Sequence, residues 1–250
     1  MRSVPRRRKP SLAARARPFW ILWVVAAGAL VAAGAWLAQS PWFRIVQVSI
    51  DVPASSPVSR ADVASAAAIT PGANLWLLDA GAIARRIEAI PYVDRASVRR
   101  AQFPQPVVEI ATTMRRPAAC VTGVDAAVTI DATLRVLQTD CVAADVPSID
   151  AAGASLPAAG RTIVNASVAS LVADAKQLAD GGVTVRRLSR DRWGGLVAVD
   201  ARGVTLEFGN DADLARKVAL VGPVRNGVGS KRPIRAIDLR SPGTPTVEFR

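Results

Sequence analysis

The residues of this 250-residue sequence that could do acid–base chemistry are carboxylates, because the sequence contains no histidine. Ser-His-Asp and Cys-His catalysis and every histidine-bearing metal site are therefore excluded. The carboxylates weighed as catalytic groups are Asp131, Asp200, Glu207 and Asp238. Each is expected in or beside a strand or turn, where hairpin geometry favours Asp, and no pair has a spacing that requires general acid–base catalysis. No glycine-rich phosphate-binding loop precedes a helix. The sequence therefore predicts no enzyme, no cofactor, no metal site and no small-molecule substrate.

The two cysteines, Cys120 and Cys141, are too few for a four-thiolate zinc site and form no C-x-x-C redox motif. In an oxidising compartment a disulfide between them would close a 20-residue segment and stabilise the fold by roughly 3 kcal/mol. That segment reads as two strands, 127–131 and 134–139, around a tight turn. The alternative is that both are small buried thiols that never meet.

The net charge of +12 is concentrated at the N-terminus. Residues 1–17 carry seven basic side chains and no acidic one. Such a tail could bind nucleic acid, but it lacks interleaved aromatic residues and precedes an apolar segment. Contact with anionic lipid headgroups, worth about 1 kcal/mol per basic residue near the surface, explains it more simply. We therefore expect membrane lipid, and no nucleic acid, as a partner of the tail.

Residues 19–38 form the only long uncharged run, FWILWVVAAGALVAAGAWLA. As a helix, twenty residues span the roughly 30 Å hydrocarbon core of a bilayer. Trp20 and Trp23 stand at one end and Trp36 and Trp42 at the other, as in an aromatic belt. The positive-inside rule places residues 1–18 in the cytoplasm and the chain after about residue 40 outside.

A cleaved signal peptide is the alternative interpretation of this run. Signal h-regions usually hold about 7–15 residues, which is shorter than the run here. The best-placed cleavage motif ends at Ser40, and Pro41 would directly follow the cut. An uncleaved anchor is the favoured prediction.

Two domains are expected beyond the span. The first has the order β-α-α-β-β, an α+β unit, with a strand at 43–50, helices at 59–69 and from Asp79 to 90, and strands at 96–101 and 107–112 joined by a turn at 103–106. The second is a mostly antiparallel β domain with two helices. It has a long loop at 140–162, a helix capped by Asn165, strands at 183–188, 196–200 and 204–208, a short helix from about 211, and strands at 234–238 and 246–249.

The chain resembles the FtsQ/DivIB family of bacterial cell-division proteins over nearly its whole length. The segments that carry the resemblance are PWFRIVQVSI (41–50), PGANLWLLDAGAIARRIEAIPYVDRASVRRAQFPQPVVEI (71–110), RRPAA (115–119), VTLEFGND (204–211) and IDLRSPGTPTVEF (237–249). The resemblance implies a cytoplasmic tail at 1–18, a transmembrane helix at 19–38, a POTRA domain at 43–113 and a β domain at 114–250. Three positions depart from the family pattern: Met114 replaces Glu, Leu134 replaces the Gly of a D-x-x-G hairpin, and Ser241 replaces an aromatic residue.

The resemblance implies a non-enzymatic divisome scaffold, essential for septum formation, that links early and late cell-division proteins. Such a protein would sit in the inner membrane at the division septum with its C-terminal domains in the periplasm. The β domain would bind the FtsB–FtsL pair, and the POTRA domain would contact FtsK-like partners. The alternative is another single-pass POTRA protein of envelope assembly or secretion.

The strand at 244–249 is the expected binding site, because a terminal strand at a sheet edge can accept a partner strand. Pro245 is tolerable at the start of an edge strand. Phe249 would be an apolar anchor, or alternatively would cap the domain's own core, and Arg240 and Arg250 could pair with acidic partner residues. The candidate partner-binding residues are Arg240, Ser241, Gly243, Thr246, Val247, Glu248 and Phe249.

Overall fold

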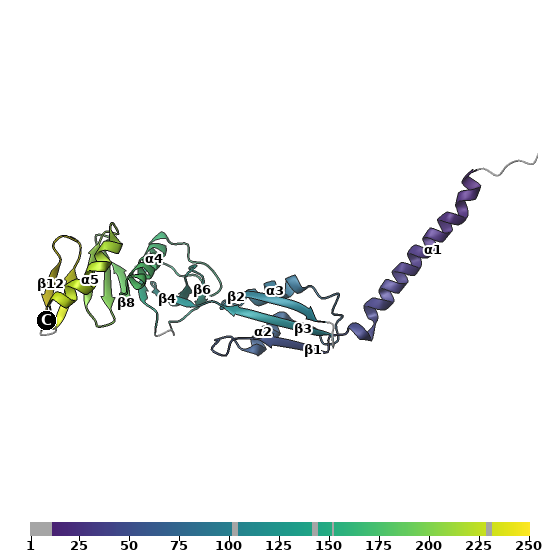
Figure 1. Cartoon of the computed structure of the whole chain (residues 1–250), viewed down its shortest axis with the longest axis horizontal. Coiled ribbons are helices and arrows are strands. Elements are labelled where there is room, and N and C mark those ends of the chain that lie inside the picture. The colour runs from purple at the N-terminus through teal and green to yellow at the C-terminus, as the bar shows by residue number, and fades with distance from the viewer. Residues whose placement is uncertain (1–11, 102–104, 142–144, 152, 229–231) are drawn as a thin grey trace, which may run out of the picture. The chain divides into compact units, whose positions relative to one another are not determined.

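A computed structural model describes residues 12–101, 105–141, 145–151, 153–228 and 232–250, with only the backbone described at 12–19 and 37–38 (Figure 1). The chain divides into two compact units. The first comprises Met1–Val52, Ser59–Arg85 and Ser97–Ala111, and the second Pro53–Val58, Arg86–Ala96 and Thr112–Arg250. Residues 1–11 of the predicted tail, and parts of the predicted turn at 103–106 and loop at 140–162, lie outside the described residues.

The first helix, α1, runs from Leu12 to Gln39 and contains the whole uncharged run. Across the part of the chain that is described, no helix meets the length and apolarity needed to cross a membrane. The transmembrane span therefore stays a prediction. Ser40 separates α1 from a 3-10 turn, η1 (Pro41–Phe43), and its hydroxyl accepts a hydrogen bond from the Trp42 amide at 3.4 Å.

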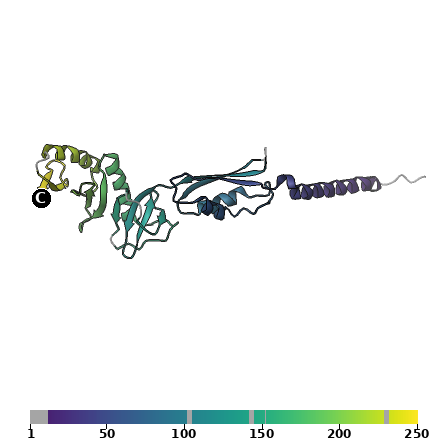
Figure 2. The same cartoon turned by 90° about the horizontal axis from the view of Figure 1, so that it is seen from below.

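A three-stranded sheet with two helices follows, in the predicted β-α-α-β-β order. Its elements are β1 (Gln47–Asp51), α2 (Arg60–Ala67), α3 (Ala80–Glu88), β2 (Val93–Ala101) and β3 (Val107–Met114). The strand order is β1-β3-β2, with β1 parallel to β3. Figure 2 shows both helices on one face of the sheet. Side chains cap the start of both helices: Ser59 and Asp62 form a capping box on α2, and the Asp79 carboxylate accepts the Ala82 amide at 2.9 Å.

The second unit is built on a nine-stranded sheet with the order β12-β11-β10-β9-β8-β7-β4-β5-β6. Its strands are β4 (Pro117–Thr122), β5 (Ala127–Asp131), β6 (Val136–Gln138), β7 (Ser148–Asp150), β8 (Val185–Arg190), β9 (Leu196–Asp200), β10 (Thr205–Gly209), β11 (Ile234–Asp238) and β12 (Thr246–Phe249). The sheet is mixed, because β4–β7, β7–β8 and β10–β11 are parallel while the other neighbours are antiparallel.

The prediction of a continuous loop at 140–162 is wrong, because β7 lies within it. β7 pairs with β4 on one side and β8 on the other, and Ile149 at its centre is fully buried. Three residues are too few to show a period, so the hydrogen bonds of two neighbouring strands define this strand rather than its own pattern.

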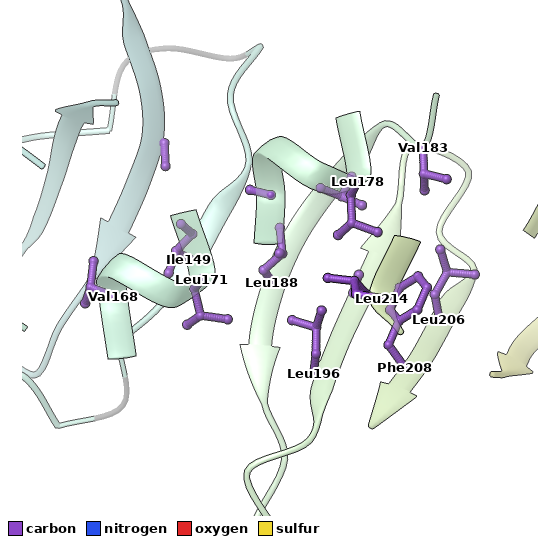
Figure 3. Packing of buried hydrophobic residues seen from close by; sticks show 14 of the residues in the cluster. Ile149, Val168, Leu171, Leu178, Val183, Leu188, Leu196, Leu206, Phe208 and Leu214 are labelled. Atoms are coloured by element: carbon purple, nitrogen blue, oxygen red, sulfur yellow. The ribbon is translucent and has the colours of Figure 1, made fainter. Parts of the chain in front are cut away.

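Two helices complete the core of the second unit: α4 (Ala166–Asp180) and α5 (Leu214–Val228). The Asn165 side chain caps α4, accepting the Ser167 amide at 2.9 Å as predicted. Figure 3 shows side chains of α4 and of the sheet packing against one another, including Leu171, Leu178 and Leu188.

One residue of α5 breaks the apolar pattern of the core. Lys217 is only 2% exposed. Its ammonium group donates to the carbonyl oxygens of Phe208 and Asn210, both at 2.9 Å, and to the Asn210 side-chain oxygen at 3.0 Å. Three acceptors match the three donors of the group, so this buried charge is fully hydrogen-bonded and ties α5 to the end of β10.

Candidate functional site

Strand β12 is the outermost strand of the large sheet. It pairs antiparallel with β11, with Val247 opposite Ile237 and Phe249 opposite Ile234. No described strand pairs with its other edge. Alternate backbone N–H and C=O groups of an edge strand point away from its one neighbour, so this edge can accept another strand.

The segment that leads into β12 is a surface turn. The Thr244 amide donates to the Ser241 carbonyl at 3.1 Å, and both Ser241 and Gly243 are exposed. Pro245 comes directly before the strand, where its missing N–H removes no bond from the ladder. Among the predicted site residues, the structure brings Ser241 and Gly243 to this turn and Thr246, Val247, Glu248 and Phe249 into the strand itself.

The side chains of β12 differ in how far they are exposed. Phe249 is 36% exposed and is not part of the buried core, so the structure does not favour the alternative in which it caps that core. The Arg232 guanidinium lies 5.5 Å from the centre of the Phe249 ring, within cation–π range. Val247 is half-buried, whereas Glu248 is exposed and its carboxylate lies 2.9 Å from the Arg235 guanidinium.

Arg240 already has acidic neighbours within the chain. Its Nη2 lies 2.5 Å from an Asp238 oxygen and 3.4 Å from an oxygen of Glu207. The hydrogen bond from Arg240 lowers the pKa of Asp238 below its ordinary value. Gly209 makes room for this arrangement, because a Cβ atom there would lie 2.9 Å from Arg240 Cγ. An acidic residue of a partner would therefore have to compete with, or extend, an existing ion pair.

A groove of basic residues adjoins the C-terminal end of β12, at Arg250. It has a volume of about 520 Å³, and four of its lining residues, which we call the arginine groove, are Arg202, Arg225, Arg232 and Arg250. No acidic side chain lines it. Arg225 forms an ion pair with Asp200. Among the described residues, no acidic side chain forms an ion pair with Arg202, Arg232 or Arg250. Arg202, Arg225 and Arg232 could not be predicted as a group from the sequence, because they belong to three separate segments that only the fold brings together.

The carboxylates considered for catalysis have structural roles. Asp200 Oδ1 accepts the amides of Arg202 and Val204, each at 2.8 Å, across the β9–β10 turn. Asp131 Oδ1 accepts the Thr133 amide at 2.8 Å and the Arg135 amide at 2.9 Å across the β5–β6 turn. Asp131 and Asp200 therefore act as hairpin residues, as predicted. The described residues contain no group of three or more potential metal ligands of the His, Cys, Asp and Glu types.

The two cysteines are joined in the structure. Their Cα atoms lie 5.5 Å apart, a separation typical of a disulfide. Cys120 is in β4, opposite Thr129 of β5, toward the other end of the sheet order from β12. The bond therefore links β4 to the segment after β6, so that β5 and β6 lie between the two joined residues. It takes no part in the β12 edge.

Residues 43–111 match the family model of the FtsQ-type POTRA domain. The chain therefore contains a POTRA domain of the FtsQ type. The matched range begins in η1 and ends within β3, so it covers both helices and most of the three-stranded sheet. No curated protein sequence matches the chain. The β12 edge and the arginine groove lie outside the matched POTRA residues.

Proposed function

We propose that the protein is a scaffold of the bacterial cell-division machinery, acts by binding rather than catalysis, and is essential for septum formation. It links early and late division proteins and binds the FtsB–FtsL pair through the β domain at 114–250. FtsK-like partners contact the POTRA domain, for which we propose the boundaries 43–113. The observation that carries this proposal is the FtsQ-type POTRA match at residues 43–111.

The β12 edge supports a binding mode for the FtsB–FtsL pair. A partner strand added to this edge would gain affinity from backbone hydrogen bonds and specificity from alternate side chains. Phe249 offers an apolar contact beside the added strand. Arg232 and Arg250 of the arginine groove offer positive charge close to the same end of β12, where acidic partner residues would be favoured.

The proposed location is the inner membrane, with residues 19–38 as a single span, residues 1–18 in the cytoplasm and the C-terminal domains in the periplasm at the septum. The support comes from the uncharged run, its flanking tryptophans and the basic segment before it. The joined cysteines fit an oxidising compartment.

Imaging of a fluorescent fusion during constriction tests the proposal. A septal band that coincides with constriction is the expected result. A uniform envelope signal with no midcell band would contradict a division scaffold, and copurification with outer-membrane or secretion machinery would then favour the alternative of an envelope-assembly component.

A further inference from the structure

Four large apolar side chains are exposed where the first unit begins after α1. Trp42 is 81% exposed, Val46 67%, Trp76 56% and Leu77 72%. Isolated apolar residues on a surface need no explanation, but a cluster with two tryptophans marks an interaction surface. We call these four residues the juxtamembrane platform.

Hydrogen bonds between two short segments hold the platform together. The Leu75 amide donates to the Phe43 carbonyl at 2.8 Å, and the Ile45 amide donates to the Ala73 carbonyl at 2.9 Å. Arg44 and Asn74 form an antiparallel bridge between them. These contacts hold residues 43–45 against residues 73–75, and Trp42 and Trp76 each directly adjoin one of these paired segments in the sequence.

The burial pattern shows that the exposure is built into the fold. Ile45 and Leu75, which alternate with platform residues, are 7% and 0% exposed and fix both segments to the core of the unit. Trp42 lies in the 3-10 turn η1, and Trp76 and Leu77 lie in the turn after Asn74, so these platform side chains stand on turns beside the two anchoring residues. The segments 41–46 and 73–78 contain one basic residue, Arg44, and no acidic residue.

The platform lies within reach of the proposed membrane anchor. The predicted span ends at Ala38, and Trp42 follows four residues later. Four residues extend at most about 14 Å, and the headgroup layer on each side of a bilayer is about 5–8 Å thick. Trp42 therefore cannot lie far from the lipid headgroups if residues 19–38 span the bilayer.

We propose that the juxtamembrane platform of the POTRA domain rests in the headgroup region of the lipid bilayer. This inference depends on the membrane anchor in the proposed function. Tryptophan favours that region because its apolar ring enters the acyl boundary while its N–H stays hydrated, and Arg44 can contact lipid phosphate. The platform thereby restrains the POTRA domain through a second contact besides its covalent link to α1.

Site-specific fluorescence of the full chain in lipid nanodiscs, one copy per disc, tests this contact. The two native cysteines are joined and the described chain has no free cysteine, so Leu77→Cys adds a single thiol for an environment-sensitive label. The discs contain phosphatidylethanolamine and phosphatidylglycerol, with a spin label near the headgroups on a fraction of the lipids. Val164→Cys is the matched control, because Val164 is 98% exposed and belongs to the second unit.

The lipid-borne quencher should quench the label at Leu77, and iodide in solution should quench it about twofold less than the label at Val164. A label at Trp36→Cys, inside the predicted span, reports the anchor separately. If the Trp36 label is in the lipid while the Leu77 label is as open to iodide as the Val164 label, the platform inference is overturned alone. If the Trp36 label itself is aqueous, the anchor and the inference fall together.

Discussion

The guanidinium of Arg115 lies 2.8 Å from the carboxylate of Asp131, with both side chains largely removed from solvent. The same guanidinium lies 3.1 Å from Asp94 and donates to the Val93 carbonyl at 3.2 Å. Arg115 thus connects the start of β2 to the end of β5 within the second unit. This residue opens the RRPAA segment, and its contacts supply a structural reason for an arginine there.

Replacing Arg115 should destabilise the second unit. Arg115→Gln leaves the Asp131 carboxylate buried without its cation, which we expect to cost about 2–4 kcal/mol in the free energy of unfolding. Urea unfolding of the full chain in detergent measures this. Arg116→Gln is the control, since Arg116 is the exposed neighbour, and its effect should stay within about 0.5 kcal/mol. Equal effects of the two substitutions would contradict the structural role of Arg115.

Asp131 should make the fold sensitive to acid. Burial alone would raise its pKa, but hydrogen bonds from Thr133, Arg115 and Arg135 together hold the pKa below its ordinary value of 3.8. The unfolded state therefore binds this proton more readily, and the stability that Asp131 contributes is present above about pH 4 and lost as the pH falls through the folded-state pKa. Asp131→Asn should flatten the acid limb of a stability–pH profile. An unchanged acid limb would show that other carboxyls control it.

Asp174 should have the opposite effect. Burial, together with repulsion from Asp211, raises its pKa above 3.8 despite the Arg190 guanidinium at 2.8 Å. The folded state therefore holds this proton more tightly than the unfolded state, so the contribution of Asp174 to stability falls as the pH rises from about 4 through its folded-state pKa. The stability of the parent protein minus that of Asp174→Asn should fall as the pH rises, whereas the same difference for Asp131→Asn should increase as the pH rises. Trends in the same direction for both variants would contradict the prediction.

Reduction of the Cys120–Cys141 bond should lower thermal stability. The bond spans a sequence separation of 21 residues, for which the loss of chain constraint is about 3 kcal/mol. Thermal unfolding with and without a phosphine reductant measures the shift. The double variant Cys120→Ser, Cys141→Ser should already melt at the lower temperature and respond no further to the reductant. A change in the melting temperature of that variant on adding the reductant would show that the reductant does not act through this disulfide.

Phe249→Ala should weaken capture of the FtsB–FtsL pair. If the ring is a main anchor beside the added strand, its loss should raise the Kd by about 30-fold. Because Phe249 is 36% exposed and outside the core, the fold should be little affected. Surface-immobilised partner pairs measure the Kd, and Val164→Ala serves as the exposed control. Unchanged capture by a folded Phe249→Ala protein would move the binding site away from the end of β12.

Sequence patterns predicted those parts of the fold that local chemistry determines. Asp131 shows this clearly: although Leu134 replaces the expected glycine, Leu134 adopts a left-handed φ of 65°, and the Asp131 side chain holds the turn. β7 could not be predicted, because its pairing with β4 and β8 is non-local. The pattern at 246–249 predicted strand β12, and the sheet order places it at the edge, whereas the arginine groove forms only because the fold brings Arg202, Arg225 and Arg232 together from separate segments.

Lys217 has a practical consequence for mapping contacts of this molecule. The sequence has only four lysines, and the ammonium group of Lys217 is enclosed by its three oxygen acceptors, whereas Lys176 on α4 is exposed. Amine-reactive cross-linkers and acylating agents will therefore modify Lys176 and leave Lys217 intact in the folded protein. The described residues of β12 and the arginine groove include Glu248 and four arginines but no lysine, so carbodiimide and dicarbonyl reagents can modify them where amine-reactive reagents cannot.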